Sequence, residues 1–179
     1  LEGLPADPRI EIHRLGHKGI VHALNNGLEL CSATWIARFD GDDLMAPDRL
    51  EKQLEYAESK KLDWVSCNVE LFGEKNDNKG YQEYVAWHNS LTDFKLSRYI
   101  ECPMIHPTWM LKRKVFMKNG FYKEGDFPED YEFFLRSHED CSLGRVPETL
   151  MYWRDSPTRL SRKDKSYSEE AFRALKTEY

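Results

Sequence analysis

Residues 35–43 read Trp35-Ile36-Ala37-Arg38-Phe39-Asp40-Gly41-Asp42-Asp43, so that a short apolar run ends in three carboxylates within four residues. We expect residues 34–39 to form a buried strand that delivers Asp40 to its end. Open α/β sheets bind their ligands at the ends of strands. Three crowded anions either retain protons or bind a cation, and hard oxygen ligands at this density suit Mg²⁺ or Mn²⁺ next to substrate phosphates. A solvated acidic turn is the structural alternative.

The composition restricts the classes of protein to which the chain can belong. Its 179 residues, 40% of them hydrophobic, suffice for one sizeable core but not for two. The formal net charge of -5 argues against nucleic acid as a partner and against an anionic membrane surface as the main one. No apolar run approaches the length of a membrane span, and no signal sequence opens the chain, so we expect no transmembrane segment. The four cysteines form no C-x-x-C pair, so we expect neither a zinc site nor disulfide bonds. This use of cysteine is typical of a cytoplasmic protein.

Strand and helix patterns alternate along the chain and predict a single α/β domain. We expect strands over residues 9–15, 34–39, 62–72, 108–111 and 145–153. We expect helices over residues 18–31, 112–118, 129–138 and 168–176, and mixed structure over 81–101. A further helix is expected to start at Pro47, with Leu50, Leu54 and Ala57 as its apolar stripe. The polar segment 73–80 is the expected boundary between a donor and metal half (about 9–75) and an acceptor half (about 81–179) of this one domain.

Two other kinds of site can be compared with the acidic triplet. An EF-hand loop that starts at Asp40 needs glycine at its sixth position, where the chain has Met45, so this alternative fails. An aspartyl nucleophile that forms an aspartyl-phosphate would use Asp40, with Asp42 as the acid or base. This second alternative stays open.

A second acidic pair, Glu129-Asp130, opens the helix predicted over residues 129–138. Acidic residues favour helix N-termini for purely structural reasons. Together with the triplet, however, the pair would supply the second part of a transfer reaction. A metal would hold a diphosphate leaving group, while a carboxylate deprotonates the attacking hydroxyl.

These motifs resemble those of the inverting glycosyltransferases of family 2, which have the GT-A fold. The similar segments are His17-Lys18-Gly19, residues 23–28, 36–43 and 47–53, His106-Pro107-Thr108, Gly120-Phe121-Tyr122, Glu129-Asp130-Tyr131 and Trp153-Arg154-Asp155. They follow the expected order over most of residues 10–162. The resemblance implies a Rossmann-like mixed sheet flanked by helices.

The resemblance also implies a donor site. Asp40 and Asp42 match the D-x-D motif that binds a divalent cation, Mn²⁺ or Mg²⁺, and the diphosphate of a nucleotide-sugar donor, with a UDP-sugar expected. Asp43 matches the adjoining acidic position. Arg38 either reaches the diphosphate or pairs with a local carboxylate. Lys18 resembles a donor-side position, although a solvated lysine is the more common outcome.

The implied acceptor side accepts a glycan or a lipid-linked saccharide. Asp130 matches the catalytic base that activates the acceptor hydroxyl, with Glu129 as the alternative, and direct displacement would invert the anomeric centre. His106, Trp153 and Arg154 are candidate acceptor-side residues. His106 equally suits a structural hydrogen bond. Trp109 and Trp153 could stack on a sugar ring, but core packing is favoured for both.

The chain departs from the family pattern at two places. It starts beyond the usual first strand and helix, which read the nucleotide base. A catalytically incomplete remnant that acts as a binding module, or a homodimer formed through an exposed sheet edge, is therefore an alternative. Relatives also often have a metal-binding histidine where this chain has Ser156, and Asp155 is the candidate substitute. The expected location is the cytoplasm or the inner face of the membrane.

Overall fold

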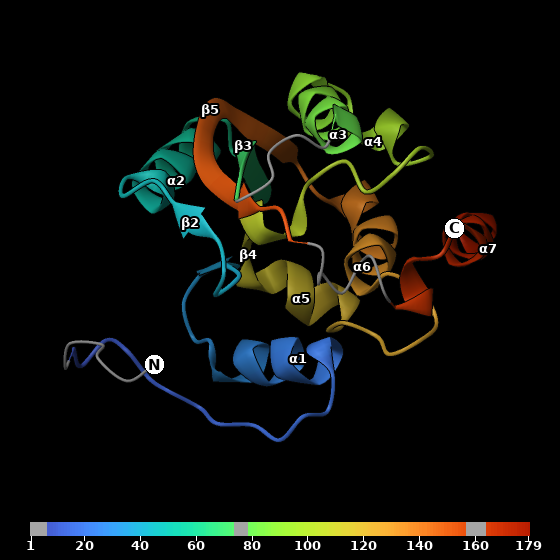
Figure 1. Cartoon of the computed structure of the whole chain (residues 1–179). Coiled ribbons are helices and arrows are strands. Elements are labelled where there is room, and N and C mark those ends of the chain that lie inside the picture. Colours follow the sequence, from blue (N-terminus) through green and yellow to red (C-terminus); the bar gives the residue numbers. More distant parts are fainter. Residues whose placement is uncertain (1–6, 74–78, 157–163) are drawn as a thin grey trace.

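The computed structural model of the chain describes residues 7–73, 79–156 and 164–179, which form a mixed sheet with helices on both faces (Figure 1). The described strands are β1 (Trp35–Ala37), β2 (Leu44–Met45), β3 (Trp64–Phe72), β4 (Met110–Lys112) and β5 (Leu143–Arg154), in the spatial order β1-β4-β3-β5-β2. The two long strands, β3 and β5, are parallel, and the other pairs are antiparallel. The predicted α/β class and mixed sheet are confirmed.

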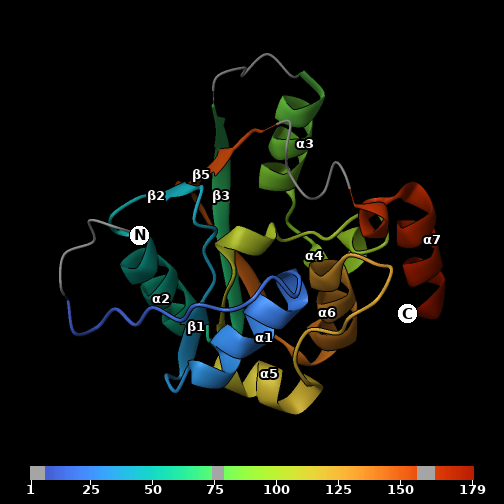
Figure 2. The same cartoon turned by 60° about the horizontal axis from the view of Figure 1, so that its bottom comes forward.

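Helices cover both faces of this sheet. They are α1 (Ile20–Leu30), α2 (Arg49–Ser59), α3 (Lys79–Ser90), α4 (Phe94–Ser97), α5 (Arg113–Asn119), α6 (Glu129–Ser137) and α7 (Glu169–Glu178), with 3₁₀ turns η1 (His106–Thr108), η2 (His138–Asp140) and η4 (Lys165–Tyr167). Helices α1, α5 and α6 lie together on one side, and α2 lies on the other (Figure 2). Within the described residues, no helix has both the length and the apolar character needed to span a bilayer.

Successive side chains of β3 point to opposite faces of the sheet, and this divides the core into two clusters. Trp64 points to the face that α1, α5 and α6 cover, whereas Val65 points to the face that α2 and α3 cover. Both side chains are fully buried. Since β3 pairs with β4 and β5, this central strand fixes the position of the neighbouring strand ends.

The structure corrects two predicted strands near the start of the chain. Residues 9–15 form no strand, and Ile10 and Ile12 are about half exposed, because no sheet edge in the described part of the chain pairs with them. Strand β1 exists, but it lies at the end of the strand order and is only half-buried, contrary to the predicted buried strand.

The predicted face of α2 was also wrong in part. Leu50 is 46% exposed, whereas Arg49 and Gln53 are fully buried beside Ala57. The two polar side chains are buried because they satisfy each other and the backbone. The Arg49 Nε–H donates to Gln53 Oε1 (2.8 Å), and an Arg49 Nη2–H donates to the carbonyl oxygen of Arg38 (3.0 Å).

Other differences from the predictions concern boundaries. Of the polar segment 73–80, residues 74–78 lie outside the described residues, and Lys79 and Gly80 belong to α3. Thr108 lies in η1, and the strand expected over residues 108–111 begins at Met110. Strand β2 was not predicted. All four cysteines are free thiols.

A buried arginine on β5 holds the segment that follows α3. The Arg145 guanidinium donates to the carbonyl oxygens of His88, Leu91 (3.4 Å) and Pro103 (2.6 Å). It also lies over the ring of Phe94, 5.0 Å from the centroid. Arg145 thus binds three backbone carbonyl oxygens in and after the last turn of α3, of which that of His88 also accepts the Leu91 N–H (3.2 Å).

We predict that Arg145→Met lowers the free energy of unfolding by about 2–4 kcal/mol, since each buried acceptor left without a donor costs about 1–3 kcal/mol. Urea denaturation measures this change. Arg173→Met is the matched control, because Arg173 forms an exposed pair with Glu169 and should change stability by less than about 0.5 kcal/mol. Equal effects of the two substitutions would contradict the structural role of Arg145.

Candidate active site

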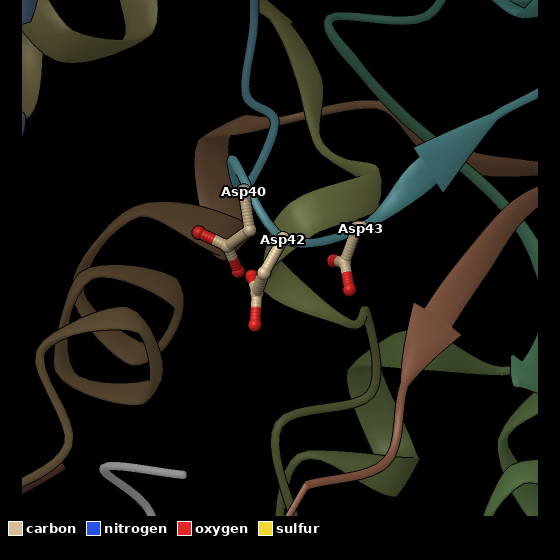
Figure 3. A group of neighbouring side chains, drawn as sticks. All are labelled: Asp40, Asp42 and Asp43. Carbon is tan, nitrogen blue, oxygen red and sulfur yellow. The ribbon is translucent and has the colours of Figure 1, made fainter. Parts of the chain in front are cut away.

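The three carboxylates of the acidic triplet lie together in the loop between β1 and β2 (Figure 3). One oxygen from each of Asp40, Asp42 and Asp43 lies within 4.8 Å of the others. A turn closes the loop, in which the Asp43 N–H donates to the carbonyl oxygen of Asp40 (3.2 Å). Asp42 is exposed, Asp40 is half-buried and Asp43 is 6% exposed. The predicted strand-end cluster therefore exists.

Two arginines hold this loop. Both Nη atoms of Arg38 lie 2.6 Å from the carboxylate of Asp40, so Arg38 forms the local ion pair that the sequence left open. From the end of β5, the Arg154 backbone N–H donates to Asp43 Oδ1 (2.8 Å), and its Nε–H donates to the carbonyl oxygen of Asp42 (2.7 Å). Asp42 is left as the most exposed carboxylate of the three.

The donor set fits a hard divalent cation. Three carboxylate oxygens converge within 4.8 Å, and such oxygens are the ligands that Mg²⁺ and Mn²⁺ prefer. The exposure of Asp42 leaves an open side at which a phosphate ligand can complete the coordination. Asp155, the candidate substitute ligand, does not line the cavity described below, and its backbone N–H donates to the carbonyl oxygen of Phe72 (2.9 Å).

The second acidic pair begins α6, and its two members have different environments. Glu129 is 4% exposed, and its Oε2 accepts a hydrogen bond from the Tyr167 hydroxyl (2.7 Å). His106 Nδ1 lies 3.7 Å from Glu129 Oε1, and His106 Nε2 lies 2.8 Å from the Tyr122 hydroxyl. Burial, aided by the charge of Arg38, lowers the pKa of His106 well below its usual value. The imidazole is therefore neutral, and its contact with Glu129 is not an ion pair.

Asp130, by contrast, is only half-buried and borders open space. Its Oδ1 accepts a hydrogen bond from the Tyr131 N–H (2.8 Å). Desolvation and the negative charge of Glu129 raise the pKa of Asp130 well above the usual carboxyl value, with a smaller contribution from Glu101. A carboxyl group with a raised pKa is suited to accept and release a proton.

One cavity of about 590 Å³ joins the two acidic groups. Its walls include the predicted site residues Arg38, Asp40, Asp42, Asp43, His106, Glu129, Asp130, Trp153 and Arg154. Three predicted candidates do not line the cavity: Lys18 is exposed, Trp109 is fully buried in the core, and Asp155 follows β5.

The cavity also contains residues that the sequence did not identify, among them Tyr84, Glu101 and Tyr167. Tyr81 and Tyr84 lie three residues apart on α3, a spacing that places two aromatic rings on one helix face and could have been recognised. Glu101 and Tyr167 belong to no local motif. Their position depends on contacts with segments distant in the sequence.

The chain was compared with known proteins. The family model described as "Glycosyl transferase family 2" matches residues 1–120. The O-antigen biosynthesis glycosyltransferase WbnJ of Escherichia coli is 33% identical over 135 residues, which cover 75% of this chain and 52% of that protein. The UDP-Gal:alpha-D-GlcNAc-diphosphoundecaprenol beta-1,3-galactosyltransferase of Escherichia coli is 28% identical over 147 residues, 81% of this chain and 52% of that protein. The chain thus spans about half the length of these two curated relatives.

Solved structures show the same fold. Residues 1–349 of TarS from S. aureus, in complex with UDP-GlcNAc, superpose with a TM-score of 0.58 at 13% identity, over 84% of this chain and 43% of that one. The mannosyltransferase PcManGT from Pyrobaculum calidifontis, in complex with GDP-Man and Mn²⁺, gives a TM-score of 0.54 at 16% identity, over 79% of this chain and 38% of that one. The predicted GT-A fold is confirmed.

The raised pKa of Asp130 predicts a pH-dependent stability. The folded protein binds more protons than the unfolded chain between the two pKa values of this group, so its stability falls as the pH rises through that window. Asp130→Asn removes the free-energy cost of ionising this carboxyl group. We expect this variant to be as stable as the parent near pH 4 and more stable near pH 8, by about 1.4 kcal/mol for each unit of the shift.

Urea denaturation between pH 4 and pH 8, without divalent cations, measures this difference. Asp126→Asn is the control, because Asp126 forms an exposed pair with Lys165 and should not become stabilising as the pH rises. If Asp130→Asn shows no gain in stability at pH 8 relative to pH 4, the assigned direction of the pKa shift is wrong.

Proposed function

The chain belongs to glycosyl transferase family 2, and we propose that it transfers a sugar from a nucleotide-sugar donor to a hydroxyl of a glycan or lipid-linked acceptor, with inversion and with a divalent cation. The observation that carries this proposal is the single cavity of about 590 Å³, whose wall includes both the acidic loop and the Glu129-Asp130 pair. A cation site next to a proton acceptor is what such a transfer requires.

The donor occupies the side of the cavity formed by the loop after β1. Asp40 and Asp42 would hold Mn²⁺ or Mg²⁺, which supplies electrostatic stabilisation of the departing diphosphate. Asp43 orients the loop through Arg154, and Arg38 orients Asp40. Relatives support a UDP-sugar donor, because the names of the galactosyltransferase and the TarS complex contain UDP-Gal and UDP-GlcNAc. The PcManGT complex, which contains Mn²⁺, supports that cation.

Asp130 acts as the base. Both side chains line the cavity, but Glu129 is 4% exposed and already accepts a hydrogen bond from Tyr167, whereas Asp130 is half-buried. As the bond from the acceptor oxygen to the anomeric carbon forms, the bond from that carbon to the diphosphate oxygen breaks, and the hydroxyl proton moves to Asp130. Attack on the face opposite the leaving group inverts the anomeric centre.

Family membership gives no support to the aspartyl-phosphate alternative for Asp40. The other alternative, a catalytically incomplete binding module, is an outcome of the experiment below. Lys18 lies outside the cavity, and its donor-side role stays a prediction.

The experiment measures nucleotide release from a panel of UDP-sugars and GDP-Man by the full chain with Mn²⁺, with and without saccharide acceptors. Asp130→Asn should reduce transfer about 10²–10⁴-fold, because general base catalysis contributes this much, and should leave the affinity for UDP within about twofold. Asp126→Asn, outside the cavity, serves as the matched control.

The results separate the alternatives. Metal-linked UDP binding without any turnover by the parent chain would favour the binding module. Transfer by Asp130→Asn at the parental rate would refute the assignment of the base. Loss of UDP binding in this variant would place Asp130 at the donor instead.

A further inference from the structure

Part of the cavity wall takes no role in the proposed chemistry. Tyr81 and Tyr84 from α3, Trp153 from β5 and Glu101 from the segment before η1 all line it. They come from three different parts of the chain. An aromatic surface and a carboxylate in the same cavity as the base are features of a ligand-binding site.

The three aromatic rings form one surface. The ring centroids lie 5.9 Å apart for Tyr81 and Tyr84, 6.0 Å for Tyr81 and Trp153, and 6.4 Å for Tyr84 and Trp153. The Tyr84 and Trp153 rings are inclined by only 34° to each other, and both side chains are half-buried. Aromatic faces of this kind, with a few placed polar groups, are typical of small-ligand sites. A pyranose presents a matching face of C–H groups.

Helix α3 holds this surface in place. The Asn89 side-chain amide accepts from the Val69 N–H (3.1 Å) and donates to the Val69 carbonyl oxygen (2.9 Å) on β3. Arg145 on β5 donates to the carbonyl oxygens of His88, in the last turn of α3, and of Leu91, just after it. Because α3 is attached at two points to the sheet, the ring of Tyr84 has a defined position relative to the base.

Glu101 supplies the polar contact. Its Oε1 accepts a hydrogen bond from the Cys102 N–H (2.9 Å), which orients the carboxyl group and leaves further acceptor positions on its oxygens. Its negative charge contributes to the raised pKa values of both Tyr84 and Asp130. Glu101 lines the same cavity as both the aromatic surface and the base.

We propose that Glu101, Tyr84 and Trp153 form the acceptor subsite and that it takes an uncharged pyranose, whose C–H face stacks on the two rings and whose hydroxyl next to the reacting one donates to Glu101. This inference rests on the proposed function and names its acceptor class. Carboxylate oxygens accept hydrogen bonds from sugar hydroxyls but repel other anions. The Glu101 carboxylate therefore disfavours a uronic acid in this position.

The test is saturation-transfer NMR on the full chain with methyl glycosides of glucose, galactose, N-acetylglucosamine and glucuronic acid, in the presence of Mg²⁺ and UDP. We expect at least one neutral glycoside to bind and the glucuronide to bind at least about tenfold more weakly, a difference of about 1.4 kcal/mol. Glu101→Gln and Tyr84→Ala should each weaken the neutral glycoside about tenfold or more, while Tyr84→Phe keeps the ring and its binding.

Matched controls distinguish the subsite from a general change of the protein. Glu55→Gln and Tyr99→Ala replace an exposed carboxylate and an exposed tyrosine that do not line the cavity, and they should leave glycoside binding unchanged. If no neutral glycoside binds, or if Glu101→Gln and Tyr84→Ala bind as the parent does, the inference is overturned.

UDP affinity, measured on the same samples, separates this inference from the proposed function. Unchanged UDP affinity in Glu101→Gln and Tyr84→Ala supports a role in acceptor binding alone. If both variants lose affinity for UDP as well as for the glycoside, these residues bind the donor, and the inference is overturned. A parent chain that binds glycosides through Glu101 but binds no UDP would contradict the proposed function alone.

Discussion

Repulsion among carboxylates is the constraint on which this structure depends. Asp40, Asp42 and Asp43 crowd one loop, and Glu129 and Asp130 line the same cavity. Like charges at this density in a partly desolvated space repel one another. Arg38 compensates Asp40, and the backbone N–H of Arg154 partly compensates Asp43. The remaining negative charge favours a cation at the loop and raises the proton affinity of Asp130. The proposed transfer requires a site that can hold a cation and a carboxylate that can accept a proton.

Buried polar contacts position these carboxylates. Arg49 lies inside the protein, where it binds the carbonyl oxygen of Arg38, two residues before Asp40, and reaches Met151 Sδ on β5 (3.4 Å). Gln53 extends the network to the carbonyl oxygens of Val65 (3.3 Å) and Thr108 (2.9 Å). A polar face of α2 thus fixes the end of β1. A buried network of this kind is costly unless every member is satisfied, and it specifies one arrangement.

Local patterns predicted much of the fold and of the site. The long strand β3, the helix that starts at Glu129 and the acidic loop follow from periodicity and from residue types at strand and helix ends. The buried face of α2 did not follow, because Arg49 and Gln53 resemble surface residues until their partners are known. Arg49 and Met151 are 102 positions apart in the sequence.

The same limit applies to the cavity wall. Arg154 and Asp43 are 111 positions apart, and Tyr167 and Glu129 are 38 apart, so that no local pattern could reveal these contacts. Resemblance to a family supplied the candidate donor and base residues because their motifs are short and contiguous. Glu101 and Tyr84 have no such motif. They were identified only when the fold brought α3 and the segment before η1 to the same cavity as Asp130.

The most direct test of the central claim is a titration of Mn²⁺ into the full chain, with free Mn²⁺ measured by electron paramagnetic resonance, in the absence and presence of UDP. If the acidic loop holds a cation that a diphosphate completes, UDP should tighten Mn²⁺ binding about tenfold or more, and Asp42→Asn should abolish this coupling. Equal Mn²⁺ binding with and without UDP, or coupling that persists in Asp42→Asn, would contradict the account.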